Sequence, residues 1–130
     1  MKVKKVNIVK LFDKRILKKF PLLSFKLNPT DDIFENPYLD CDCYVSYTSN
    51  GTMLGVCVIK DFHIYLFEIN KFLRGKGYGR RFFERIVKII STPEQKITLN
   101  YLDDNALKFW TSVGCIETDR QNQSLEYTID

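Results

Sequence analysis

Several residue types and features that would narrow the class of this chain are scarce or missing. The sequence has one histidine and one tryptophan in 130 residues. It has no apolar run that approaches the ~20 residues a helix needs to cross a bilayer. The lysines near position 1 are not followed by an uninterrupted apolar segment, which a secretory signal peptide would require. We therefore expect a cytoplasmic protein without a membrane partner.

The four cysteines do not form a recognisable pattern. They are spaced irregularly, at positions 41, 43, 57 and 115, in a chain whose hydrophobic content is an ordinary 45%. This favours free thiols in a reducing compartment over a disulfide framework. Cys41 and Cys43 could share a metal ion, but the sequence lacks a second Cys or His pair at zinc spacing, so we expect no metal site.

Charge is unevenly distributed, although the net charge is only +4. Residues 1–26 carry nine Lys or Arg and one acid, which gives +8, whereas residues 27–59 carry five acids and no Lys or Arg, which gives −5. The remaining residues, with eleven basic and ten acidic side chains, contribute +1. A basic segment of this kind can contact nucleic acid or form a solvated face. Its amphipathic spacing favours the solvated face.

Hydrophobic periodicity and turn signals predict a single domain, residues 1–130, without an internal repeat or linker. The first part is expected to contain a strand over 3–9, a helix over 10–20 that Pro21 stops, and a loop over 21–40 with room for a helical turn after Thr30. The second part is expected to contain a hairpin over 43–60 around Asn50-Gly51, a strand over 62–70, a helix over 80–90, a strand over 96–101, a helix over 103–113, and strands over 115–119 and 124–129. This order predicts an α/β (α+β) fold, with a mixed, mostly antiparallel sheet flanked by helices.

A glycine-rich basic turn connects the strand over 62–70 to an amphipathic helix. Its glycines stand at every second position, at 75, 77 and 79, and Arg74, Lys76 and Arg80 lie among them. Glycines allow close approach of the backbone, and a helix N-terminus adds positive potential. The turn is therefore predicted to bind an anion, a phosphate or a pyrophosphate.

Two motifs now suggest a family. The segment Arg74-Gly75-Lys76-Gly77-Tyr78-Gly79 resembles the Arg/Gln-x-x-Gly-x-Gly pyrophosphate loop of the GNAT superfamily of acyl-CoA N-acyltransferases, which also lies between a strand and a helix. The segment NALKFWTSVGC (105–115) is similar to the family's Asn-x-x-Ala-x-x-hydrophobic-Tyr-x-x-x-Gly-Phe segment. The resemblance covers about residues 42–129 and implies a GNAT-like fold.

The resemblance also implies a reaction. Acetyl-CoA would lie between the strands over 62–70 and 96–101, and a primary amine would attack its thioester directly in a ternary complex, without a metal. The cofactor-binding residues carried over are Phe67, Ile69, Arg74, Gly75, Lys76, Gly77, Tyr78, Gly79, Arg80, Asn105 and Trp110. The acceptor would be the amine of a small molecule or peptide. The acids of residues 31–42 could attract a cationic amine, although a solvated loop is the favoured interpretation.

The resemblance suggests His63 and Tyr101 as catalytic residues. His63 stands eleven residues before Arg74, where many relatives carry a glutamate thought to act as a base, and a structural strand histidine is the alternative. By strict two-residue alternation His63, Tyr65, Phe67 and Ile69 share one face. Glu68 would then face the other way, solvated or paired. Trp110 occupies the position of the usual tyrosine, and an indole cannot protonate a thiolate. Tyr101, Tyr78 or solvent could serve as the acid instead, and Tyr101, at the end of its strand, is the best placed of them.

The sequence also departs from the family's pattern elsewhere. Asn105 directly precedes Ala106, whereas the family's Asn stands three residues before its Ala, where this chain has Asp103; Cys115 replaces a Phe. The alternative functions are a catalytically silent acyl-CoA-binding or regulatory module and, less favoured, a nucleic-acid binder that uses the basic N-terminal helix and the RGKGYGRR turn. A homodimer through residues 124–129 is a further expectation.

Overall fold

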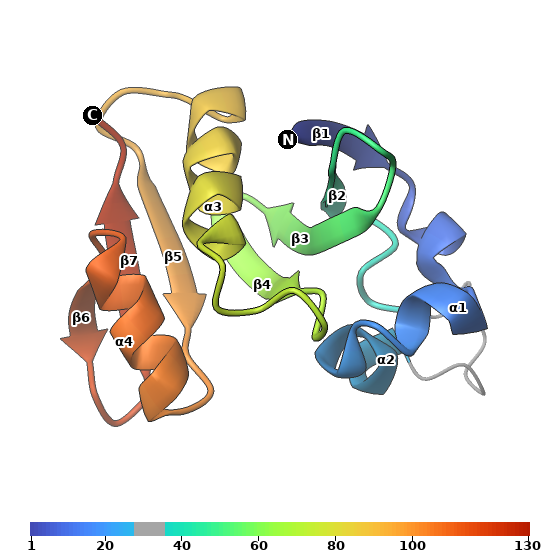
Figure 1. The fold of residues 1–130 in the computed structure, drawn as a ribbon. Helices are drawn as coiled ribbons and strands as arrows, with labels where there is room; N and C mark the ends of the chain where they lie inside the picture. Colours follow the sequence, from blue (N-terminus) through green and yellow to red (C-terminus); the bar gives the residue numbers. More distant parts are fainter. Residues whose placement is uncertain (28–35) are drawn as a thin grey trace.

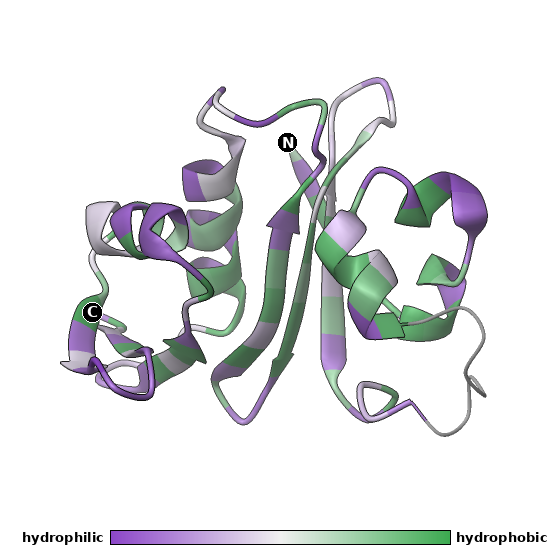
Figure 2. Ribbon diagram, turned by 90° about the horizontal axis from the view of Figure 1, so that it is seen from below, coloured by the Kyte–Doolittle hydropathy of each residue, from purple (hydrophilic) through white to green (hydrophobic). Residues whose placement is uncertain are grey.

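The computed structural model describes residues 1–27 and 36–130, within which seven strands form one mixed sheet in the order β1-β2-β3-β4-β5-β7-β6 (Figure 1). Figure 2 shows the strands between helices on either side. The strands are β1 (Lys2–Val6), β2 (Asp42–Tyr47), β3 (Met53–Lys60), β4 (His63–Ile69), β5 (Lys96–Asn100), β6 (Ile116–Asp119) and β7 (Ser124–Thr128). The helices are η1 (Ile8–Leu11), α1 (Lys14–Leu17), α2 (Pro21–Leu27), α3 (Tyr78–Ile89) and α4 (Asp104–Ser112). The predicted mostly antiparallel mixed sheet with flanking helices is confirmed.

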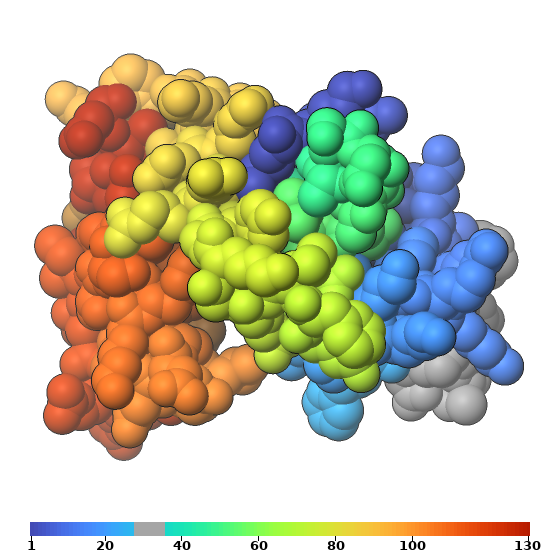
Figure 3. Space-filling view, viewed as in Figure 1, coloured from blue at the N-terminus to red at the C-terminus, as the bar shows by residue number. Residues whose placement is uncertain are grey.

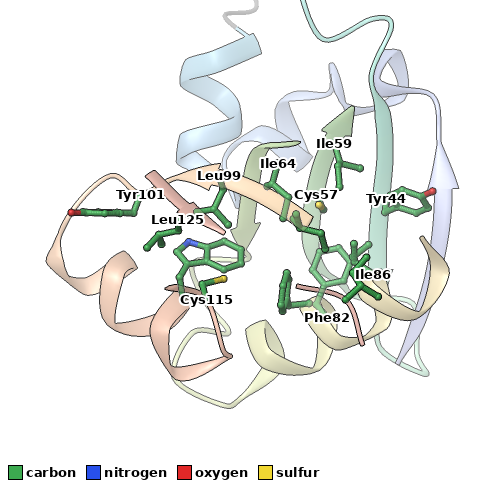
Figure 4. Close-up of a cluster of buried hydrophobic side chains, with 14 residues drawn as sticks. Tyr44, Cys57, Ile59, Ile64, Phe82, Ile86, Leu99, Tyr101, Cys115 and Leu125 are labelled. Carbon is green, nitrogen blue, oxygen red and sulfur yellow. The ribbon is translucent and has the colours of Figure 1, made fainter. Parts of the chain in front are cut away.

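Each face of the sheet has its own hydrophobic cluster. The first cluster lies under α3 and α4 and includes Phe82, Phe83, Ile86 and Trp110 (Figure 4). The second lies under the N-terminal helices and includes Leu17, Phe20 and Leu23. Both clusters take side chains from β2, β3 and β4, so these three strands form the shared centre of the structure.

From residue 42 onward the expected elements are present with small shifts. Gly51 takes a φ of +88° in the turn between β2 and β3, as the Asn50-Gly51 signal predicts. The next turn is centred on Asp61 and Phe62, both at positive φ, one residue later than expected. The helix after the glycines begins earlier than predicted, at Tyr78, and Asp103 caps α4 by accepting a hydrogen bond from the Ala106 N–H at 2.8 Å.

The prediction for the N-terminal part is wrong in its boundaries. A short strand is followed by η1 and α1 instead of one helix over 10–20, and the loop predicted over 21–40 begins with a third short helix, α2. The side chains of Asn7 and Asp13 each cap a new helix, accepting from Val9 N at 3.0 Å and Arg15 N at 2.8 Å, and this divides the segment. Pro21 starts α2 instead of ending a helix, because the first helical position needs no N–H donor. The expected helical turn after Thr30 and the acids Asp31, Asp32 and Glu35 lie outside the described residues.

Strands β4 and β5 form the one parallel pair among the described strands, and they separate early. Their register covers only His63 with Thr98 and Ile64 with Leu99. Beyond Ile64 the two strands pair no further, although β4 continues to Ile69. The predicted opening between these strands is therefore present.

A bulge in β4 overturns the predicted side-chain alternation. Val58 of β3 pairs with Leu66 and Ile59 pairs with Ile64, which leaves Tyr65 as an extra residue. Ile64 consequently points into the first cluster (Figure 4), as Phe67 and Ile69 do, and Leu66 points into the second. His63, next to Ile64, is therefore on the opposite face from Phe67, so the prediction of one common face is wrong.

Two other expectations concern the strands at the end of the chain and the cysteines. Strand β7 pairs with β5 over residues 124–128 and with β6 over residues 124–126, so β6 is the outer strand here. A homodimer through residues 124–129 stays a prediction. The four cysteines are free thiols, and burial raises the pKa of both Cys43 and Cys115 to about 12. Among the described residues no helix has the length and apolar content to span a membrane.

Candidate active site

A groove of about 740 Å³ opens where β4 and β5 separate. In Figure 3 a hollow is visible between the yellow-green loop before α3 and the orange α4. Ten of the eleven predicted cofactor-binding residues line it, the exception being the exposed Lys76. The lining residues are Pro21, Leu22, Phe67, Glu68, Ile69, Leu73, Arg74, Gly75, Gly77, Tyr78, Gly79, Arg80, Leu102, Asp103, Asn105, Ala106, Phe109, Trp110 and Ser112.

The three glycines of the loop are required for two different reasons. Gly75 and Gly77 have φ values of +78° and +82°, which most side chains avoid. Gly77 is also the N-cap of α3 and has no side chain with which to occupy the first-turn N–H groups. Gly79 allows a close approach, since a Cβ there would lie 2.9 Å from Phe109 Cε1 of α4. The loop therefore leaves backbone donors open to the groove and holds α3 against α4.

Positive charge is concentrated at this end of α3. Arg80 and Arg81 lie in the first helical turn, and acidic residues are absent from that turn. Cations at a helix N-terminus oppose the macrodipole, so an anion bound there would be stabilised by both the arginines and the helix. Arg80 also donates a hydrogen bond of 2.7 Å to the Ser112 carbonyl at the end of α4.

Arg74 is directed back onto β4. Its Nη2 lies 3.1 Å from Glu68 Oε2, and its Nε donates to the Ile69 carbonyl at 3.2 Å. The side chain is about half exposed, so it borders the groove while being held at one end by Glu68.

Glu68 was predicted to be solvated or paired, and it is paired. It is only 5% exposed and accepts hydrogen bonds from Leu22 N at 2.9 Å and Leu23 N at 2.8 Å. The same carboxylate thus caps the start of α2 and holds Arg74 at the start of the glycine loop. Sequence reasoning did not place Glu68 in the groove; its six-residue spacing from Arg74 was the one available signal.

The two predicted catalytic residues lie outside the groove. His63 lines neither this groove nor a second cavity of about 90 Å³. Its Nδ1 is 2.7 Å from Thr98 Oγ1, and partial burial lowers the pKa of the imidazole, which favours the neutral form. Its role as a base stays a prediction, and one that the groove geometry does not support.

Tyr101 lines the second cavity, but its hydroxyl is already engaged. It donates a hydrogen bond of 2.7 Å to Glu117 Oε2, and this bond is the main cause that raises the pKa of Tyr101. Loss of its proton would place a phenolate beside a carboxylate. Its role as the acid also stays a prediction.

Trp110 packs among aromatic rings between the two cavities. Its ring lies 5.1 Å from that of Phe67 and 5.3 Å from that of Phe83, both edge to face. Trp110 and Phe67 line both cavities, which therefore adjoin through the opening between β4 and β5. Among residues 1–27 and 36–130 no group of three or more His, Cys, Asp or Glu side chains is placed to hold a metal ion.

Comparison with known proteins places the fold. No protein-family profile and no curated protein matches the chain. Among solved structures, AtaTR bound with acetyl-CoA matches at 14% identity, covering 98% of this chain and 92% of the other, with a TM-score of 0.68. AtaT complexed with acetyl-methionyl-tRNAfMet matches at 12% identity, covering 98% and 94%, with a TM-score of 0.68. A GNAT-family acetyltransferase from Staphylococcus aureus Mu50 matches at 12% identity, covering 99% and 100%, with a TM-score of 0.65.

These matches define the class of fold. The chain has a GNAT-like acetyltransferase fold, as its two motifs predicted. Further matches include the AtaT–AtaR and KacTA complexes with DNA.

Proposed function

We propose that this protein is an acetyl-CoA-dependent N-acetyltransferase. The observation that carries the proposal is the groove at the β4–β5 opening, which is bordered by Arg74-Gly75-Lys76-Gly77-Tyr78-Gly79 and the N-terminus of α3. A strand with one free edge beside an anion-binding loop suits a ligand that has an amide-rich arm and a pyrophosphate. The likeness in fold to AtaTR, whose structure contains acetyl-CoA, agrees with this assignment.

The groove residues divide into two working parts. The loop and first turn of α3 would hold the pyrophosphate. Positive charge would come from Arg80, which lines the groove, and from Lys76 and Arg81, which flank it in the sequence without lining it. The edge of β4 from Phe67 to Ile69, which β5 leaves unpaired, would hydrogen-bond the pantetheine arm. Acetyl-CoA would supply the activated acetyl group. Anchoring it here makes attack by an amine effectively intramolecular, which in well-oriented cases lowers the barrier by roughly 7–11 kcal/mol.

The acceptor is proposed to be an amine carried by RNA, an aminoacyl-tRNA. The sequence-based expectation favoured a small-molecule or peptide amine and disfavoured nucleic acid. The similar structures contradict this expectation, because AtaT was solved with acetyl-methionyl-tRNAfMet, and AtaT–AtaR and KacTA were solved with DNA. Residues 1–26 carry a net charge of +8, and Lys26 from this segment lines the second cavity, which supports an RNA acceptor.

A silent acyl-CoA-binding module is the second candidate. It is favoured by the absence of an obvious acid: Trp110 cannot donate a proton to a thiolate, and the Tyr101 hydroxyl is bound to Glu117. Tyr78, which lines the groove, or solvent would have to protonate the leaving thiolate if the protein is an enzyme.

Binding is tested with a matched pair of variants at Gly77. A Cβ at this position meets nothing within 4 Å, although its φ of +82° strains any side chain placed there. Gly77→Ala carries this strain without an oxygen that could cap the first turn, and it is therefore the control for Gly77→Asp, which adds a carboxylate at the anion site. Saturating acetyl-CoA, at about 100 times its Kd, should stabilise the wild type by about 2.7 kcal/mol. Thermal unfolding should show a similar ligand-induced shift for Gly77→Ala and little or none for Gly77→Asp.

Gly79 is a poorer position for the same test, because its Cβ would also displace Phe109. Absence of any wild-type shift with either acetyl-CoA or CoA would reject both the enzyme and the silent module.

Turnover is tested by release of free CoA thiol. Aminoacyl-tRNA, free amino acids, polyamines and peptides are each offered with acetyl-CoA. We expect release with aminoacyl-tRNA and no release with uncharged tRNA, which lacks the amine. Tight CoA binding without release across the whole panel would favour the silent module.

A further inference from the structure

An aromatic and basic cluster lies on the face of the sheet opposite the first hydrophobic cluster. The bulged Tyr65 is 43% exposed, and its ring lies 4.7 Å from that of His63 and 6.2 Å from that of Tyr38. Lys26 of α2 donates to the Tyr65 carbonyl at 3.1 Å, and its Nζ is 5.9 Å from the centre of the Tyr38 ring. We call Lys26, Tyr38, His63 and Tyr65 the Tyr65 platform.

The platform borders the second cavity. Lys26 and Tyr65 line that cavity together with Asn100 and Tyr101. The cavity and the groove share Leu22, Phe67, Leu102, Ala106 and Trp110, so they meet at the β4–β5 opening. A ligand on the platform would therefore reach the inner end of the groove from the side opposite the glycine loop.

Charge at this position favours an anionic ligand over a cationic one. Lys26 brings a cation to the platform, and among the described residues no Asp or Glu lines the second cavity. Glu68 is engaged with α2 and Arg74, and Glu117 with Tyr101 and Arg120. Within residues 1–27 and 36–130, a protonated polyamine in this cavity would thus meet Lys26 and no lining carboxylate. Exposed aromatic rings beside a cation are instead the combination that binds single-stranded nucleic acid, through base stacking and phosphate contact.

We propose that the Tyr65 platform binds the terminal nucleoside of the RNA that carries the acceptor amine. This inference rests on the proposed function, since it names the acceptor side of the same site. The base stacks on Tyr65, Lys26 contacts a backbone phosphate, and the amine-bearing group enters the second cavity toward Trp110. At about 90 Å³ that cavity is too small for a nucleoside, which keeps the base outside on the platform.

The experiment uses a hairpin RNA with a short single-stranded 3′ end whose last base is 2-aminopurine, a base whose fluorescence falls when it stacks. Binding to the whole protein is measured without acetyl-CoA, for wild type, Tyr65→Ala and Tyr65→Phe. Phe72→Ala is the control, because Phe72 is an exposed aromatic that lines neither cavity. We expect Tyr65→Ala to weaken binding roughly 5- to 150-fold and to abolish the fluorescence change. Tyr65→Phe and Phe72→Ala should bind like the wild type.

Lys26 is tested through salt dependence. Lys26→Ala should reduce the slope of log affinity against log salt concentration by about 0.7, the loss of one phosphate contact on a single strand. Lys26→Arg should keep the slope. The acetyl-CoA thermal shift of each variant is measured separately, so that a failure of the proposed function shows in that shift and not in RNA binding.

Three results would overturn the inference. The first is wild-type-like RNA binding and fluorescence by Tyr65→Ala. The second is undetectable RNA binding by the wild type. The third is a polyamine that binds more tightly than the RNA and loses its affinity in Tyr65→Ala, which would make the platform a site for cationic amines.

Discussion

At the scale of single residues, local backbone geometry holds the glycine loop, whereas contacts distant in the sequence position Glu68 and Tyr65. The loop is local, and its glycines are fixed by backbone geometry within a few positions. Glu68 depends on contact with Leu22, which is 46 residues away in the sequence, and Tyr65 depends on a bulge set by the pairing of β3 with β4. Strict alternation therefore placed His63 on the wrong face of β4, and no local pattern showed where the alternation would break.

The contacts of Glu68 predict a specific loss of stability in Glu68→Gln. The amide keeps the size of the side chain, but its NH₂ group must face an N–H of α2 or the Arg74 guanidinium, which places two donors together. Leaving such buried donors unpaired typically costs about 1–3 kcal/mol. The Arg74 ion pair adds little by itself because Arg74 is half exposed.

The free energy of unfolding, measured in urea, tests this expectation. Glu84→Gln is the matched control, because Glu84 is an exposed residue of α3 and its loss should change stability by less than about 0.5 kcal/mol. Equal effects of the two substitutions would mean that Glu68 does not hold α2. A larger loss for Glu68→Gln together with weaker acetyl-CoA binding would link α2 to the loop.

Secondary-structure elements could be predicted well where turns and alternation agree. The segment from β2 to β7 has a strong turn signal at Asn50-Gly51, an N-cap at Asp103 and a helix-ending Gly114, and its elements lie where expected. The N-terminal segment contains two further caps: Asn7 ends the predicted strand early, and Asp13 divides the predicted helix. Greater weight on capping residues would have located these breaks, since both caps act within two residues.

The early separation of β4 from β5 is the element-scale feature from which the site follows. The separation could be predicted only from the family resemblance, because hydrophobic periodicity does not show where two strands stop pairing. The two cavities meet at this opening, and Phe67 and Trp110 lie between them. An acyl donor and an acceptor could thus approach one point from opposite faces of the sheet.

At the scale of the whole molecule, the two hydrophobic clusters lie on opposite faces of the same strands. Leu23 belongs to the second cluster and is fully buried, whereas Trp110, the one tryptophan, belongs to the first. Because β2, β3 and β4 contribute to both clusters, we expect a mutation that creates a cavity in one cluster to destabilise the other cluster by the same amount. Leu23→Ala should lower the free energy of unfolding by about 2–5 kcal/mol.

Two signals followed during urea unfolding test this expectation. Tryptophan fluorescence reports on Trp110 in the first cluster, and far-ultraviolet circular dichroism reports on the secondary structure. Both signals should move to lower urea by the same amount in Leu23→Ala, with coincident transitions, although Trp110 is not in the mutated cluster. Ile116→Ala is the control, since Ile116 is 68% exposed on the outer strand β6 and its truncation should change stability by less than about 0.5 kcal/mol. A Trp110 transition that stays at the wild-type urea concentration while the circular dichroism shifts would mean that the two faces unfold independently. The groove would then rest on the first cluster alone, and the N-terminal helices would be a separable layer.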